Sequence, residues 1–462
     1  MQDTKLLIYS SRDSSRLQYI LQLMLYDLLG LDFEFTKDEQ RFLAFNGPKL
    51  CYGLHNAGGV VFIHADELLF DTGIHPVSFH TGIYQEVTTI FHHAQKSALP
   101  FDPFAAAFYL VSRFEEYLPF RADQHDRFPA ALSIGYRHGF LRVPVVNHYA
   151  LFLQQLLQQH FPEIIFHLKK YRFQLTYDID MAFAYREKGL LRNTAGLLRS
   201  VITLNLKAFT NRLKVLAGFE QDPFDTFGYQ RLLHERYALQ PVYFFLLGDY
   251  SRYDKNIGWK NAAFRQVVKA TAESCPTGIH ASYASNRLPG KLITEKERLE
   301  KITGTKVFRN RQHYLKLQMP GTYQRLLAAG ITEDFTMGYA SQIGFRAGIA
   351  APFYFYDLER EATTELLIHP FAAMDATLFY HLEMDALTAL QQVKLLADEV
   401  KKVNGTFIFL AHNDLISQHG PWKAWHQHFE TLLSYCSASV KIFTETNITP
   451  SADLRKPLPF EP

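Results

Sequence analysis

The sequence has few cysteines, no surplus of either charge and no long apolar run. Its 462 residues include 3 cysteines, and 48 Lys+Arg stand against 46 Asp+Glu. Cys51, Cys275 and Cys436 lie far apart and form no CxxC pair, which argues against a disulfide framework and a thiolate zinc site. The balanced charge gives no indication of nucleic-acid binding, because duplex binders need a basic surplus on one face.

Signals for membrane insertion and for several enzyme classes are also missing. No stretch reaches the roughly 18 uncharged apolar residues that predict a transmembrane helix, and the apolar run from Leu6 to Tyr9 is too short for a signal-peptide core. A Walker phosphate loop, a GxGxxG after a strand, a GxSxG elbow and an HExxH motif are absent, which disfavours nucleotide-binding enzymes and serine hydrolases. We therefore expect a cytoplasmic protein that does not bind nucleic acid.

The length and the pattern of the chain predict two domains. At about 100 to 200 residues per domain, 462 residues suffice for two or three, and 47% of them are hydrophobic. Strands and helices alternate from Leu6 onward, and the pattern changes near residue 165. We expect an amino-terminal α/β accessory domain at 1–168, a larger domain at 169–450 and a tail at 451–462.

The larger region repeats a short β-rich run, a polar loop and a helix. Seven or eight such units in about 280 residues predict a closed or nearly closed β/α barrel. The expected strands are Arg172–Asp178, Pro241–Leu247, Thr277–His280, Lys306–Arg309, Ile331–Thr336, Ala351–Tyr356, Glu365–His369 and Thr406–His412. The expected helices are 261–274, 294–302, 320–328, 384–402 and 421–434.

A basic helical insertion interrupts this pattern at 186–216. Residues 186–214 contain seven cations and a single acid, Glu187, interleaved with leucine, isoleucine and valine. One interpretation is an amphipathic helix in peripheral contact with the inner membrane surface, through 186–214. The alternative is a solvated helix packed on the barrel wall.

Ionisable residues close the predicted strands in an ordered series. In a β/α barrel, catalytic groups lie where strands end and loops begin, at the carboxyl face. The residues found there are Asp178 and Asp180 at the first strand, His280 at the third, Arg311 and His313 after the fourth, Asp334 in the next, and His412 at the last.

These residue types suit a metal-assisted hydrolase. Asp178 and Asp180, two positions apart at a breaking strand, allow one carboxylate to bind a metal while the other acts as a base. A borderline divalent cation accepts carboxylate and imidazole ligands together, and a separate histidine can serve as an acid. Each residue alone is also compatible with a structural role, such as a helix cap or a hydrogen-bonded core histidine. Their order along successive strand ends favours a site.

The motifs TYDID, GIHASY, RQHY and LAH, in that order, resemble those of the polysaccharide deacetylases, the NodB homology domain of carbohydrate esterase family 4. The resemblance covers about 170–447 and implies a distorted (β/α)7–8 barrel of the glycoside hydrolase/deacetylase type. Segments such as AAFYLVSRFEEYLPF and GFRAGIAAPFYFYDL, with MDATL, look like a divergent intracellular branch. That branch is found in Bacteroidetes-type bacteria and carries an extra amino-terminal domain.

The resemblance implies a role for each matching position. Asp178 corresponds to the base, His412 to the general acid, and Arg311 to the arginine that keeps the base charged. Asp334 lies in the region of the acidic residue that orients the acid. Asp180, displaced by the inserted Ile179, and His280 correspond to metal ligands. The implied cofactor is a divalent metal, with zinc expected and other divalent cations as alternatives.

The sequence departs from the family pattern at the second metal histidine, where it has Ala284. His313 stands where the family has proline, so His313 is either the displaced third ligand or a residue that supports the ligands. Without a third ligand, metal binding and hydrolysis would be weakened. Loop residues that suit a sugar, Tyr283, Asp254, Arg346 and Asn413, are candidate substrate contacts, with ordinary loop scaffolding as the alternative.

The reaction that the resemblance implies is metal-assisted removal of an N-acetyl group from an amino sugar or glycan. Asp178 would take a proton from water, and protonated His412 would give one to the leaving amine. A glycoside hydrolase is disfavoured, because carboxylates two residues apart on one strand cannot easily flank a sugar ring. A degenerate deacetylase fold that binds glycans or scaffolds envelope polysaccharide assembly stays as the alternative.

Overall fold

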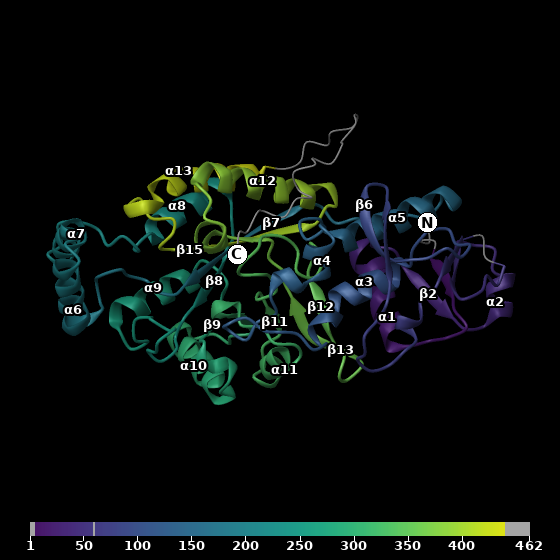
Figure 1. The fold of residues 1–462 in the computed structure, drawn as a ribbon, viewed down its shortest axis with the longest axis horizontal. Helices are drawn as coiled ribbons and strands as arrows, with labels where there is room; N and C mark the ends of the chain where they lie inside the picture. Colours follow the sequence, from purple (N-terminus) through teal and green to yellow (C-terminus); the bar gives the residue numbers. More distant parts are fainter. Residues whose placement is uncertain (1–4, 59–60, 439–462) are drawn as a thin grey trace.

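The structure is a computed structural model that describes residues 5–58 and 61–438 (Figure 1). The predicted tail at 451–462 lies outside the described residues. Figure 1 shows the small sheet and the helices near the start of the chain, in purple, at one end of the molecule and the helices α6 (Gly189–Ile202) and α7 (Leu206–Leu216), in teal, at the other end. The part between them is built on one large sheet.

A small parallel sheet begins the chain. It has the order β2-β1-β3-β4, with β1 at Leu6–Tyr9, β2 at Phe33–Thr36, β3 at Lys49–Gly53 and β4 at Val61–His64. All four residues of β1 are buried, as expected for an apolar run inside a parallel sheet. Strand β3 was not expected from the sequence.

Helix α1 (Ser15–Leu21) follows β1 and begins after a capping serine. The side chain of Ser14 accepts a hydrogen bond from the backbone N–H of Leu17, which caps the helix. A π-helical segment, Gln22–Leu28, continues it, and Gly30 ends the unit in a left-handed conformation at φ +60°.

The remaining elements of the first 160 residues pack around this sheet. Their bounds are α2 at Glu39–Ala44, the antiparallel pair β5 at His80–Tyr84 and β6 at Val87–His92, α3 at Pro103–Val111, α4 at Ile134–Arg137 and α5 at Val145–His160. Every residue of α3 is buried. This helix packs against α1 and α5 and forms the centre of this part of the core.

The large sheet has nine strands in the order β12-β13-β11-β10-β9-β8-β7-β15-β14. Seven of them coincide with or overlap predicted strands: β7 (Arg172–Ile179), β8 (Val242–Phe245), β9 (Thr277–Ala281), β11 (Glu333–Asp334), β12 (Phe353–Asp357), β13 (Ala362–Ile368) and β15 (Thr406–His412). Strand β10 (Arg309–Gln312) begins where the predicted strand ends, and β14 (Ala373–Met374) was not expected.

Helices follow most strands of the large sheet. They are α6 at Gly189–Ile202, α7 at Leu206–Leu216, α8 at Phe227–Tyr237, α9 at Ala262–Ala272, α10 at Pro289–Thr303, α11 at Gly321–Ala328, α12 at Ala386–Lys402 and α13 at Lys423–Ser437. The five helices predicted beyond residue 260 are confirmed within a few residues, except that α10 starts five residues early. Helix α8 was missed.

The expected β/α barrel, closed or nearly closed, is not confirmed in its closure, because the sheet is open. Within the described residues, no strand pairing joins the two edge strands, β12 and β14. Strands β12 and β13 are joined by a short turn without a crossover helix, so they pair antiparallel and interrupt the β/α repeat. Strand β14, the edge strand opposite β12, has only two residues and therefore offers few backbone groups for pairing.

A buried ion network joins the amino-terminal part to the large sheet. Glu116 accepts hydrogen bonds from Arg113, at 2.8 Å, and from Arg346, with Nε at 2.9 Å and Nη2 at 2.6 Å. Burial opposes the ionisation of Glu116, but the two guanidinium groups outweigh it and hold its pKa below the usual value. The hydrophobic core also runs through both parts without a break.

In the part of the chain that the structure describes, no helix combines the length and the apolarity that crossing a bilayer requires. The stretch that follows α5 and precedes β7 contains the expected boundary near residue 168 and has no helix or strand. The boundary itself stays a prediction.

The buried network predicts a large effect of one substitution. In Glu116→Gln, Arg346 keeps its charge inside the core without a counter-ion and Arg113 keeps only Glu115, so the free energy of unfolding should fall by about 3–5 kcal/mol. Urea denaturation followed by circular dichroism measures this change. Glu34→Gln serves as control, because Glu34 pairs with Arg41 at the surface. An effect of Glu116→Gln as small as that of Glu34→Gln would contradict the role of the network.

Candidate active site

A cavity of about 340 Å³ opens at the carboxyl ends of the central strands. The predicted ionisable residues that line it come from four strands or the segments that follow them: Asp178 from β7 and Asp180 just after it, His280 from β9, His313 after β10 and His412 from β15. The register aligns Asp178 with His412 and His280 with Arg311. Parallel pairing therefore brings together residues that are up to 234 positions apart.

Three of these side chains form a cluster that could hold a metal ion. Asp180, His280 and His313 each offer one ligand atom, and these atoms lie within 4.8 Å of one another. The Nε2 atom of His280 is 3.2 Å from one carboxylate oxygen of Asp180, and Nε2 of His313 is 3.6 Å from the other. Ala284, in the short helix Ala284–Asn286, stands where a third ligand was expected and has no ligand atom. His313 offers the third ligand atom instead.

Hydrogen bonds fix which nitrogen each histidine presents to the cluster. Nδ1 of His280 donates to the backbone carbonyl of Arg311 at 2.9 Å, and Nδ1 of His313 donates to Asp254 at 2.8 Å. Both Nε2 atoms are therefore left to face Asp180. Such partners are the usual support of metal-ligating histidines, because they fix the tautomer and the ring orientation.

The cluster fits a divalent cation. The Oδ1 atom of Asp180 is buried and has no hydrogen-bond partner, and two imidazole nitrogens point at the same carboxylate. One carboxylate with two imidazoles is a donor set that zinc and similar divalent cations accept. Zinc-type catalytic sites combine three protein ligands with an open position, and the cavity provides room for one.

The charges in the cluster depend strongly on one another. Burial raises the pKa of Asp180, but the positive charges of His313 and His280 outweigh this and hold the pKa well below its usual value. Burial lowers the pKa of His313, but Asp180 and Asp254 outweigh it and raise the pKa to about 9. A carboxylate that attracts positive charge so strongly is suited to a cation in place of the protons.

A second carboxylate, Asp178, lies beside the cluster and is held by Arg311. Both side chains are buried, and Nη1 of Arg311 donates to Oδ1 of Asp178 at 2.8 Å. Arg311 also donates to the hydroxyl of Thr176 and to the carbonyl of Phe335. The other oxygen of Asp178 is 3.5 Å from Nε2 of His280. Arg311 thus keeps one oxygen occupied and leaves the other next to the cluster.

His412 faces the same cavity and is oriented by Asp375, a residue that the sequence analysis did not select. Nδ1 of His412 donates to Asp375 at 2.6 Å, and the backbone N–H of His412 donates to the other Asp375 oxygen at 2.7 Å. Burial lowers the pKa of His412, but the Asp375 carboxylate outweighs it and raises the pKa to about 10. At neutral pH His412 therefore carries a proton on Nε2 as well.

The position expected for Asp334 needs correction. Asp334 accepts hydrogen bonds from Asn310 and Thr336 and is fully buried, away from the cavity. Its side chain holds β11 against β10, and Asp375, directly after β14, takes the place beside the acid. Asp375 stands in the MDATL segment, which is the sequence signal that could have identified it.

None of the four predicted substrate contacts lines the cavity. Arg346 pairs with Glu116, Asp254 supports His313, and Asn413 donates to the carbonyls of Met181 and Phe224, so their polar groups are already used. Tyr283 stacks on Tyr253, with ring centroids 4.2 Å apart. The expectation of direct contact is therefore corrected for Arg346, Asp254 and Asn413, which are buried scaffold residues.

Other side chains line the cavity and could contact a substrate. Several come from segments between the strands, where sequence periodicity gives no signal. They are Arg127, Tyr253, Lys255, Gln312, Tyr314, Tyr380 and His381. Three tyrosine rings in this wall are suited to the apolar faces of a sugar.

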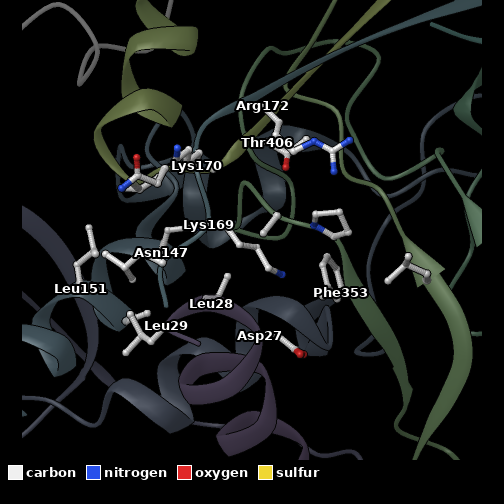
Figure 2. A pocket seen from close by; sticks show the side chains of 18 of the residues that line it. Asp27, Leu28, Leu29, Asn147, Leu151, Lys169, Lys170, Arg172, Phe353 and Thr406 are labelled. Atoms are coloured by element: carbon white, nitrogen blue, oxygen red, sulfur yellow. The ribbon is translucent and has the colours of Figure 1, made fainter. Parts of the chain in front are cut away.

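A second cavity, of about 280 Å³, includes the amino ends of β7 and β15 and the start of the antiparallel edge strand β12 (Figure 2). Its wall includes the first residues of β7, β12 and β15, namely Arg172, Phe353 and Thr406. Figure 2 shows Lys169 directed toward Asp27 and Phe353. In open parallel sheets, ligands bind at the carboxyl ends of the strands, so the cavity at Asp178 is the better candidate.

Comparison with known proteins gives limited information about this chain. The Family of unknown function (DUF7033) matches residues 6–162, which is about a third of the chain. No curated protein matches the sequence.

Several solved structures are similar at low identity. A Mycobacterium smegmatis protein assigned as a polysaccharide deacetylase is 11% identical, with a TM-score of 0.37, and the match covers 58% of this chain and 85% of that one. The polysaccharide deacetylase of Bacillus cereus is 13% identical, with a TM-score of 0.27 and coverage of 62% and 100%. A 4-alpha-glucanotransferase of Thermococcus litoralis is 10% identical, with a TM-score of 0.35 and coverage of 62% and 40%. These values are too low to assign an activity to the chain.

The support that Asp254 gives to His313 predicts a loss of metal affinity on substitution. In Asp254→Asn, an uncharged amide replaces the carboxylate that orients and polarises His313, so the affinity for Zn²⁺ should fall about 10–100-fold. Competition with a chromophoric chelator measures it, and circular dichroism verifies the fold. Asp249→Asn is the control, since Asp249 pairs with Lys291 and Arg298 at the surface. Equal affinities of the two variants would show that Asp254 does not support a ligand.

Proposed function

We propose that the protein is a divalent-metal-dependent hydrolase that removes N-acetyl groups from an amino sugar or glycan, with zinc as the expected ion. The observation that carries the proposal is the arrangement of Asp178, the Asp180/His280/His313 cluster and His412 around one cavity. A base, a cation site and an acid that face the same space are the parts that hydrolysis of an amide requires. The ordered motifs of the sequence support the same reaction.

A divalent cation held by Asp180, His280 and His313 would supply Lewis-acid chemistry, which polarises the amide carbonyl and favours deprotonation of water. Asp178 is positioned to accept the proton of that water on the oxygen that Arg311 does not occupy. The guanidinium group holds one oxygen of Asp178 and so fixes the orientation of the carboxylate. Thr176 and Phe335 in turn hold Arg311 in place.

His412 is positioned to protonate the leaving amine. Its Nδ1–H is directed at Asp375, so its Nε2–H is the proton that a substrate can receive. An amine leaves readily only after protonation, and the Asp375 carboxylate keeps His412 protonated up to a high pH. The products of this reaction are acetate and a free amino sugar.

A protein that binds glycans without hydrolysing them is the alternative, because Ala284 removes one expected ligand. His313 supplies a ligand atom in its place, and binding alone has no need of an oriented acid and base. A glycoside hydrolase is disfavoured further, because Asp178 and Asp180 both face His280 and therefore lie on the same side of the cavity.

The role of Asp178 is tested by Asp178→Asn in zinc-loaded protein. Acetate release from N-acetylglucosamine oligosaccharides should fall about 10²–10⁴-fold, because the amide cannot accept the proton of water, while the zinc content stays at one ion per chain. Asp225→Asn, on a carboxylate outside the cavity that pairs with Arg186, should act like the wild type.

Two results would oppose the proposal. Full activity of Asp178→Asn would show that Asp178 does not act as the base. Zinc-loaded wild-type protein that binds the oligosaccharides but releases no acetate would favour the glycan-binding alternative.

A further inference from the structure

Helices α6 and α7 form a hairpin at one end of the molecule, which we call the α6–α7 hairpin, residues 189–216 (Figure 1). Within the described residues, each of the two helices makes its main contacts with the other. The hairpin follows β7, the strand that carries Asp178. It does not pack along the sheet wall as a solvated helix would in the alternative considered from the sequence.

The outer surface of the hairpin is apolar. Leu190, Leu191, Leu204 and Phe219 are each more than 80% exposed, and Ile202 and Leu206 are about 70% exposed. On α6 the spacing of Leu191, Leu198 and Ile202 places these side chains along one side of the helix. Scattered apolar residues on a surface need no explanation, but a continuous group of large ones indicates a binding surface.

The inner side of the hairpin, by contrast, contains buried polar groups beside the buried Val215. Asn193 and Ser200 are buried, and Arg212 of α7 donates to the side chain of Asn193 at 3.2 Å. A Cβ atom on Gly196 would lie 2.1 Å from the Arg212 guanidinium, so α7 approaches α6 at this glycine. The hairpin therefore buries polar groups while several leucines stay exposed, an arrangement that a helix pair with water on all sides does not favour.

The charge around the apolar surface is strongly positive. Residues 186–214 contain seven cations, and Glu187 is the single acid. Arg199 and Lys207 are exposed, and neither forms an ion pair with any described residue. A surface of exposed leucines with unpaired cations nearby is complementary to a layer that has an apolar interior and anionic headgroups.

We propose that the α6–α7 hairpin docks on the surface of a bilayer that contains anionic lipids. The exposed leucines and Phe219 enter the boundary between headgroups and acyl chains, and Arg199 and Lys207 lie among the lipid phosphates. The proposal is independent of the reaction at Asp178. A second copy of this chain would bring its own seven cations to the interface, so like charges oppose self-association through the hairpin.

Vesicle sedimentation with the full chain tests this proposal. Vesicles of phosphatidylcholine with phosphatidylglycerol should carry the wild type down, vesicles of phosphatidylcholine alone should not, and high salt should release the protein. The double variants Leu191→Asp/Ile202→Asp and Arg199→Glu/Lys207→Glu should each reduce the bound fraction at least about tenfold.

Matched variants outside the hairpin serve as controls. Leu232→Asp/Leu387→Asp changes two exposed leucines, and Lys37→Glu/Lys269→Glu changes two exposed lysines. Both should bind phosphatidylglycerol vesicles like the wild type. The hairpin variants should keep the zinc content and the acetate release from soluble oligosaccharides, so failure of docking and failure of the hydrolase proposal can be told apart.

Three results would overturn docking on lipid. They are wild-type protein that stays in solution with phosphatidylglycerol vesicles, hairpin variants that sediment like the wild type, and a wild-type dimer in light scattering that Leu191→Asp/Ile202→Asp converts to a monomer. The last result would make a second copy the occupant of the surface.

Discussion

The ion pair between Arg311 and Asp178, buried at the carboxyl ends of the strands, is the interaction on which the candidate site depends. Arg311 has no exposed surface, and removal of either partner would leave a charge uncompensated inside the sheet. The pair fixes Asp178 beside the Asp180/His280/His313 cluster, and the backbone carbonyl of Arg311 orients His280. One residue therefore positions both the proposed base and a proposed metal ligand.

The sequence located the candidate site residues best where they stand at the end of a strand. Apolar runs located most strands of the large sheet, and the polar residues that close them, Asp178, His280 and His412, meet in one cavity because parallel strands end at the same edge. His313 follows directly after β10, at the same end of the sheet, which accounts for its place beside the cavity. Closure of the sheet could not be predicted, because it depends on a two-residue strand and an antiparallel pair.

The other differences between the expected and the observed site arise from contacts between residues that are distant in sequence. Arg346 looked like a substrate contact because it stands in a polar loop near the motifs, but Glu116, 230 residues away, neutralises it in the core. Asp375 and Asp334 are both acids near strand ends, and only the fold decides which one meets His412. In the α6–α7 hairpin, periodicity predicted helices but did not reveal that polar groups are buried between them while leucines stay exposed.

The central claim is that Asp180, His280 and His313 bind a divalent cation together. X-ray absorption at the zinc edge of the purified, zinc-loaded protein tests it most directly, because scattering by imidazole rings distinguishes histidine ligands from oxygen ligands. The account predicts one zinc per chain with two imidazole ligands and oxygen completing the shell, and the loss of one imidazole in His313→Ala. Zinc bound without imidazole, or a spectrum that His313→Ala leaves unchanged, would contradict it.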